Sequence, residues 1–267
     1  MKKSLTVLLV AALLLSTGTA VAGSGKNFGA GIVGWWMFDE CTGTEAEDLS
    51  GMENDGVLLG AAAFTDEALL GCAADLTGPD GAVLIPHDPS LEPVTGTVEV
   101  WVKVDVLQDS DVVMKTTDRA IRTDTPCGCS VIGIRITADG RGIGFVMNDD
   151  PTTPGAPWRA ATSPSGLITA GVWHHLALRW NGATVDIFVD GIMRASELYD
   201  PIPDLGLSYH NGSAVGLGVE TSWGIPGPHE FIGQMDDVRF YGKARRNVEI
   251  FTDFVSKGHK PAKPLGQ

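Results

Sequence analysis

The stretch GVWHHLALRWNGATVDIFVDG, residues 171–191, combines strict alternation with a turn dipeptide. In WHHLALRW (173–180), one face would hold His174, Leu176, Leu178 and Trp180, and the other Trp173, His175, Ala177 and Arg179. A period of two residues indicates a β-strand. VDIFV (185–189) then meets IMRAS (192–196) through Asp190-Gly191, a dipeptide typical of two-residue hairpin turns. The stretch therefore predicts three consecutive antiparallel strands.

The same alternation recurs along the chain, and turn residues are abundant, with 34 glycines and 15 prolines. The further predicted strands are 97–104, 131–136, 142–147, 215–220 and 231–241, with a turn at 138–140. RRNVEIFTDFV (245–255) is the clear helical candidate. Many short strands and one helix predict an all-β protein, an antiparallel β-sandwich with one short C-terminal helix.

The N-terminus has the pattern of a secretory signal peptide. Lys2 and Lys3 precede a short apolar run, and Ala20-Val21-Ala22 is a small-residue cleavage site. We therefore expect cleavage near Ala22 and a secreted, extracellular or periplasmic product. No other apolar run approaches the roughly 20 residues that span a bilayer. The expected organisation is signal peptide 1–22, linker 23–31, one domain 32–256 and a disordered tail 257–267.

The formal net charge of −14 argues against two classes of partner. An acidic chain is repelled by phosphate backbones and by anionic membranes. We therefore expect no nucleic-acid partner. Acidity also suits cation binding, although solubility alone explains it.

Four cysteines, Cys41, Cys72, Cys127 and Cys129, are expected to be oxidised in an exported protein. Three pairings are possible. We favour Cys41–Cys72, with Cys127–Cys129 closing a tight local loop. A zinc site is disfavoured because the usual two-residue spacer between cysteines is absent.

Five blocks in order resemble one family: GWWMFDE…DLSGMENDG (34–56), GTVEVWVKV, GVWHHLALRWNG, VDIFVDG and FIGQMDDVRFYGKA. Together they resemble laminin G-like, concanavalin A-like lectin/glucanase jelly-roll domains, in the superfamily of pentraxin-like domains. The resemblance runs roughly from Val33 to Phe254 and implies a jelly-roll sandwich. This fold hosts lectins, adhesins, glycosidases and lyases, so it does not decide function.

No catalytic constellation is evident in the sequence. His174 and His175 are adjacent on a strand, so they point to opposite faces and cannot share a metal. We interpret His175 as a packed histidine bonded within the sheet. Glucan-cleaving relatives carry Glu-x-Asp-x-x-Glu on one strand, and no such run exists here. The sequence therefore predicts a protein that is not an enzyme.

Calcium is the one cofactor that the sequence suggests. In MDDVRFY, alternation places Asp236 on the core face with Val238 and Phe240, where a carboxylate needs a partner. The resemblance adds a loop of oxygen ligands that includes Asp48, Asn54 and Gly56. In the alternative interpretation, Asp48 closes an Asx-turn and Asp236 accepts backbone amides.

Loop aromatics suggest a binding surface, because sugar rings stack on aromatic planes. The candidate ligand-binding residues are Trp158, Tyr209, Asn211 and Trp223. Asn211 also begins a glycosylation sequon. We predict a non-catalytic module that recognises glycans or cell-surface polymers through rim loops. The alternatives are a structural or adhesive domain that binds other extracellular proteins, and a glycosidase or lyase with an unrecognised site.

Overall fold

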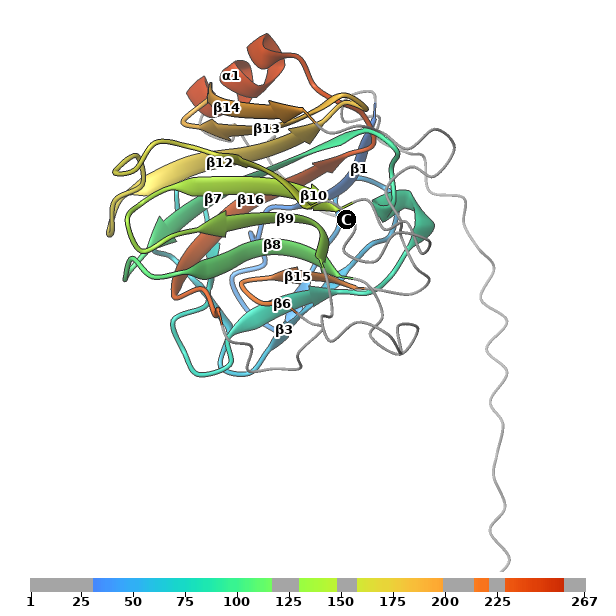
Figure 1. Ribbon diagram of the computed structural model, residues 1–267. Helices are drawn as coiled ribbons and strands as arrows, with labels where there is room; N and C mark the ends of the chain where they lie inside the picture. Colours follow the sequence, from blue (N-terminus) through green and yellow to red (C-terminus); the bar gives the residue numbers. More distant parts are fainter. Residues whose placement is uncertain (1–30, 117–129, 148–157, 199–213, 221–228, 257–267) are drawn as a thin grey trace, which may run out of the picture.

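The computed structural model describes residues 31–116, 130–147, 158–198, 214–220 and 229–256. Two antiparallel sheets of eight strands each pack face to face (Figure 1). This arrangement confirms the predicted jelly-roll β-sandwich. Within the described residues, no helix is long and apolar enough to cross a membrane.

Sheet A has the strand order β14-β13-β12-β7-β16-β5-β4, and β1 also pairs with β16. Its strands are β1 (Ile32–Trp36), β4 (Ala63–Thr65), β5 (Ala73–Asp75), β7 (Gly96–Val104), β12 (Trp173–Trp180), β13 (Thr184–Val189), β14 (Ile192–Leu198) and β16 (Gly233–Tyr241).

Sheet B has the strand order β11-β10-β9-β8-β15-β6-β3-β2. Its strands are β2 (Glu45–Ala46), β3 (Gly56–Leu59), β6 (Ala82–Ile85), β8 (Ser110–Thr116), β9 (Ser130–Ile136), β10 (Gly142–Met147), β11 (Trp158–Thr162) and β15 (Val215–Leu217). The short 3₁₀ helix η1 (Pro89–Leu91) follows β6.

The core lies between the two sheets and is built by alternation. The inward side chains of β7 and β9 are fully buried, namely Val98, Val100, Val102, Val104, Ile132, Ile134 and Ile136. Trp180 packs edge-on against Phe240, with the ring centroids 6.0 Å apart. In the β13–β14 turn, Asp190 and Gly191 have φ of 53° and 72°. Positive φ at both turn residues is what the predicted hairpin requires.

Strand β16 contains a bulge that overturns one prediction. The pairing with β7 shifts between Asp236 and Arg239, and Asp237 between them has φ of 48°. Directly opposed residues share a face, and Asp236 lies opposite Trp101 on the outer face of sheet A. Val238 and Phe240 belong to the core, so the expectation that Asp236 shares their face was wrong. The extra residue reverses the alternation, which no period-two pattern anticipates.

Helix α1 (Asn247–Val255) confirms the predicted helix and covers the outer face of sheet A. Ile250 packs against Ala177 and Phe188, which lie on β12 and β13. Phe254 stacks on Trp101 of β7, with the centroids 5.7 Å apart.

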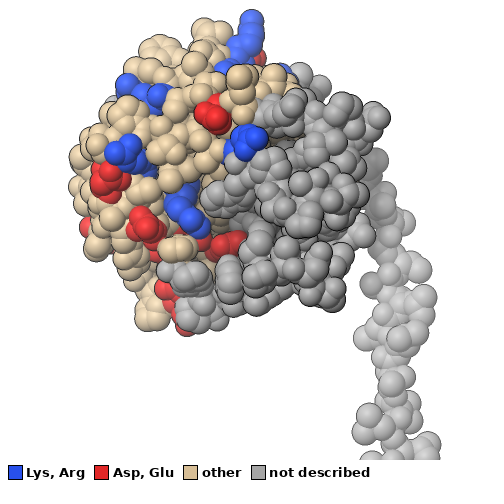
Figure 2. Space-filling view, in the orientation of Figure 1, with Lys and Arg blue, Asp and Glu red and all other residues tan. Residues whose placement is uncertain are grey.

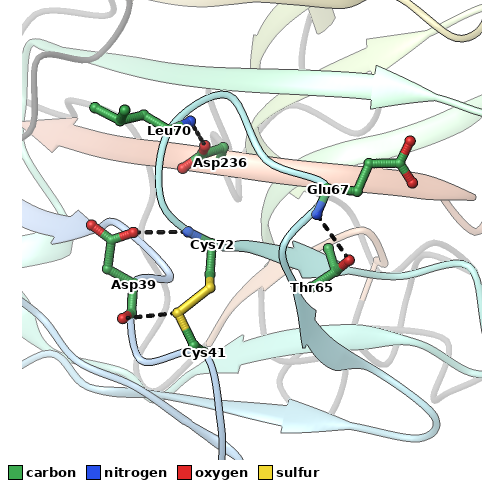
Figure 3. Close-up of a disulfide and its surroundings, with 7 residues drawn as sticks. All are labelled: Asp39, Cys41, Thr65, Glu67, Leu70, Cys72 and Asp236. Carbon is green, nitrogen blue, oxygen red and sulfur yellow. Dashed lines mark hydrogen bonds between the residues drawn. A yellow bond between two sulfur atoms is a disulfide. The ribbon is translucent and has the colours of Figure 1, made fainter.

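A disulfide joins Cys41 to Cys72, as predicted (Figure 3). The carboxylate Oδ1 of Asp39 accepts the N–H of Cys72 at 3.0 Å. Gly71 has φ of +79°, and a Cβ there would collide with the same oxygen. A glycine is therefore required beside the disulfide. Cys127 and Cys129 lie outside the described residues.

Replacing Cys41 and Cys72 by serine should lower the free energy of unfolding by about 3–4 kcal/mol. The bond closes a loop with a sequence separation of 31 residues, and loop entropy sets this magnitude. Urea unfolding measures it. The matched control replaces Cys127 and Cys129, whose predicted bridge would close a loop too short to cost much entropy. Equal losses in both double variants would contradict the expectation.

Candidate functional site

Most strands of sheet B begin or end at the same end of the sandwich. We call this row of strand ends the sheet B rim. The last residues of β6 and β8 lie beside the start of β15 through the pairs Ile85–Val215 and Lys115–Val215. The pair Met147–Trp158 shows that β10 ends where β11 begins, at the same edge.

Of the four predicted ligand-binding residues, Trp158 alone lies within the described part of the chain. Trp158 is the first residue of β11, at the sheet B rim. Tyr209, Asn211 and Trp223 lie outside the described residues. The strand that follows Tyr209 and Asn211 in the chain, β15, begins at the rim. His229, the first described residue after Trp223, accepts the N–H of Asp111 through its carbonyl, at the opposite edge of the sheet.

The predicted calcium loop also lies at the rim, where Asp48 organises it by hydrogen bonds. Its Oδ1 accepts the N–H groups of Trp35 and Ser50, at 2.9 and 2.8 Å. Its Oδ2 accepts the Ser50 hydroxyl and the N–H of Asn54, at 2.7 and 2.9 Å. Two donors on each oxygen occupy the lone pairs of the carboxylate. These are the contacts of the Asx-turn interpretation.

The other two loop residues are also held by the chain. The side-chain amide of Asn54 donates to the Val33 carbonyl and to Ser90 Oγ, at 2.8 and 2.9 Å. The backbone carbonyl of Asn54 accepts the indole N–H of Trp36. Gly56 is the first residue of β3.

Asp236 accepts hydrogen bonds from a different segment of the chain. Its Oδ2 accepts the N–H groups of Leu69 and Leu70, at 3.1 and 3.5 Å (Figure 3). It thus holds the segment that leads to Cys72 over the outer face of sheet A. Within the described ranges, no three His, Cys, Asp or Glu side chains gather as a metal site would require. Calcium binding stays a prediction.

A charged cluster at the rim was missed by sequence reasoning. The Lys115 side chain is 1% exposed and its Nζ lies 3.6 Å from Glu92 Oε1. The same oxygen is 3.4 Å from His87 Nδ1. Burial lowers the pKa of Lys115, against the attraction of Glu92. The sequence offered one signal of this cluster. Lys115 follows Val113 by two residues, so it shares the inward face of a buried strand.

The outer face of sheet B carries an apolar row beside an ion pair. Met114, Gly133, Phe145 and Ala160 are aligned across four strands. The side chains of Met114 and Phe145 meet over Gly133, where a Cβ would collide with both. Met114 and Phe145 are 0% and 1% exposed, so this row is buried.

The ion pair at the end of that face joins Asp111 to Arg135. Asp111 Oδ1 accepts the Arg135 Nε–H at 2.7 Å. Burial raises the pKa of Asp111 to about 6, although Arg135 opposes the shift. The negative charge of Glu220 contributes to this rise.

The two adjacent histidines bind different partners, as predicted from their opposed directions. His174 Nε2 accepts the N–H of Thr169 at 3.1 Å, so Nδ1 carries the proton shared with Asp190, also at 3.1 Å. Burial raises the pKa of Asp190, but bonds from His174 and His175 outweigh it and the pKa is lowered. His175 Nε2 lies 3.2 Å from Glu99 Oε2 beneath helix α1. Both histidines serve local structure.

Charge is mixed over the described part of the face shown in Figure 2. Acidic and basic side chains are interspersed among uncharged ones. This face therefore offers no single-sign field for an oppositely charged polymer.

The sandwich with a loop-bearing rim defines a lectin-like jelly-roll domain. Residues 77–251 match the family model described as the concanavalin A-like lectin/glucanases superfamily. The chain belongs to that superfamily. No curated protein matches the chain.

Solved structures share the fold at low identity. Trypanosoma rangeli sialidase aligns with a TM-score of 0.64 and 17% identity, over 86% of this chain and 33% of the sialidase chain. This chain therefore spans about a third of the sialidase. The binding domain of paraclostridial mosquitocidal protein 1 aligns with a TM-score of 0.62 and 14% identity, over 85% of this chain and 52% of that one.

A third structure is similar over nearly its whole length. Domain 4 of an extracellular arabinanase from Geobacillus stearothermophilus, solved in complex with arabinotriose, has a TM-score of 0.57 and 20% identity. The alignment covers 83% of this chain and 97% of that domain. Similarity at these identities shows the fold alone.

Asp48→Ala should lower the free energy of unfolding by about 3 kcal/mol, because four donors lose a charged acceptor. The loss should be equal in calcium and in chelator. Asp55→Ala is the control, since Asp55 accepts the single N–H of Asp48 and should cost about 1 kcal/mol. A loss that appears in calcium only would instead make Asp48 a metal ligand.

Asp111→Asn should remove a pH-dependent component of stability. The folded pKa of about 6 lies above the ordinary 3.8, so folding favours the protonated acid. The wild-type free energy of unfolding therefore falls, by roughly 2 kcal/mol, as pH rises from 4 to 6, and is level above. Chemical unfolding of both proteins from pH 4 to 7 measures the difference. Parallel profiles would refute the raised pKa.

Proposed function

We propose that this protein is a non-catalytic module that binds glycans through the sheet B rim. The proposal rests on the rim, where Trp158 begins β11 and where the strand after Tyr209 and Asn211 starts. Aromatic side chains near one rim would offer sugar rings a surface on which to stack. The arabinanase domain solved with arabinotriose and the mosquitocidal binding domain, which share the fold, support this proposal.

Two buried carboxylates, Asp111 and Glu99, do not form a catalytic pair with each other. Asp111 is paired with Arg135 on sheet B. Glu99 lies beneath helix α1 with His175 and Arg245. A glycosidase needs two carboxyl groups about 5–10 Å apart that both face the substrate. Asp111 and Glu99 lie on different sheets and are each held by a basic group.

Export supports the same function. The basic and apolar leader with cleavage near Ala22 would place the domain outside the cytoplasm, where the disulfide between Cys41 and Cys72 persists. Glycans and cell-surface polymers are available there.

A second candidate function is adhesion to other extracellular proteins. Helix α1 exposes Val248, Phe251 and Val255, with 59%, 46% and 53% of their surface accessible. Ile192 and Met193 of the edge strand β14 are also exposed. Contiguous apolar surface is typical of protein contacts.

Trp158→Ala and Tyr209→Ala should each weaken glycan binding by at least fivefold, because an aromatic anchor contributes about 1 kcal/mol or more. Phe251→Ala, which removes an exposed aromatic side chain from helix α1 on sheet A, is the matched control and should leave affinity unchanged. A glycan array selects the ligand, and titration calorimetry compares the variants. Reducing-end assays should find the bound glycan uncleaved.

Three outcomes would count against the proposal. Equal losses in all three variants would remove the rim from the site. Cleavage of the ligand would make the protein an enzyme. An array without any bound glycan would favour the adhesive alternative.

A further inference from the structure

Glu99 is a carboxylate buried beneath a helix. It lies on the outer face of β7 and is 1% exposed. Its cross-strand neighbour Ala177 packs against Ile250 of α1. Trp101, two residues along β7 on the same face, stacks on Phe254 of α1. Helix α1 therefore separates Glu99 from water.

The buried charge of Glu99 is only partly compensated. Oε2 lies 3.2 Å from His175 Nε2, and Oε1 lies 3.6 Å from Arg245 Nη1. His175 is the hydrogen-bonding partner of this carboxylate, and Arg245 opposes its charge from a longer distance. Burial raises the pKa of Glu99, with Asp253 adding to the rise and His175 and Arg245 opposing it. Burying an ionised carboxylate here costs free energy, and exposing it to water would remove that cost.

Helix α1 is held by few contacts. Ile250 is its one fully buried residue. Phe254 fits closely over Gly191, where a Cβ would lie 2.9 Å from the Phe254 side chain. Asp253 pairs with Arg245 at 2.7 Å and with Arg239 at 3.3 Å. A nine-residue helix is marginal by itself, so docking determines whether it stays formed.

We propose that helix α1 is a pH-dependent latch, which docks over Glu99 at mildly acidic pH and opens as Glu99 ionises. In the open state Glu99 returns to water and to its ordinary pKa of 4.5. The docked state favours the protonated acid. The docking free energy is therefore full below about pH 4.5, falls as pH rises to the raised pKa, and is level above. Opening would uncover Trp101 beside the Glu99 carboxylate.

Other charged groups at this interface limit how strongly the docking of helix α1 depends on pH. Their contacts place them there: His175 and Arg245 lie beside Glu99, Arg239 and Arg245 pair with Asp253, the Tyr241 hydroxyl lies 3.5 Å from Asp253, and Arg179 donates to Asn247. His175 and Arg245 favour the ionised form of Glu99, so they limit the pH dependence of docking, whereas Asp253 adds to it.

Hydrogen exchange of residues 246–256 from pH 5 to 8 tests the latch, with intrinsic rates taken from the unfolded peptide. The opening constant should rise by up to tenfold per pH unit and then level off. Glu99→Gln keeps the side-chain size and should remove the rise. Asp111→Asn, a change at a buried acid on sheet B, should keep the wild-type profile for α1. Exchange in β12 reports global unfolding and should not follow the opening of α1.

The outcomes separate the latch from general instability. Phe254→Ala should open the helix at every pH, which fixes the upper limit of exchange. A flat wild-type profile would overturn the proposal, as would a Glu99→Gln protein that keeps the rise. If Glu99→Gln does not fold, His175→Gln takes its place. Without the imidazole the ionised state of Glu99 loses a partner, so the opening constant above pH 5 should shift from the wild-type value, and an unshifted profile would overturn the proposal.

Discussion

One extra residue in β16 sets the arrangement of much of the fold. Asp237 adopts φ of 48° in the middle of a strand and forms a bulge. Before the bulge β16 pairs with β5, and after it the same edge pairs with β1. The Asp237 carboxylate accepts two bonds from Arg239 and one from the Trp35 indole. This carboxylate thereby ties β1 to the centre of sheet A.

The bulge also separates the two faces of sheet A into different chemical environments. The inner face is apolar and packs against sheet B. The outer face carries buried charged groups, among them Asp236, Glu99 and Arg239. Charged groups removed from water need partners. The segment before Cys72 supplies backbone amides to Asp236, and helix α1 supplies Asp253 to Arg239. Both covers are therefore specified by polar contacts as well as by apolar packing.

The two sheets thus have different roles. Sheet A is covered by the disulfide-linked segment and by α1, whereas sheet B presents its strand ends at the rim. Loops on a rigid sandwich are free to vary in sequence because the core does not depend on them. The superfamily's fold is compatible with several functions for the same reason. Recognition by this chain accordingly depends on which side chains reach the rim.

The sequence by itself predicted the strands with clear alternation, the hairpin at Asp190-Gly191, the helix and the opposed histidines, because alternation and turn chemistry are local properties. It also pointed to the Cys41–Cys72 pair and the Asx-turn alternative for Asp48. It did not predict β8, β11 or the short strands β2 to β6. Tertiary structure alone decided the face of Asp236, because one inserted residue reverses a period of two. It alone revealed Lys115 with Glu92 and Glu99 beneath α1, because burial of a charge depends on partners distant in sequence.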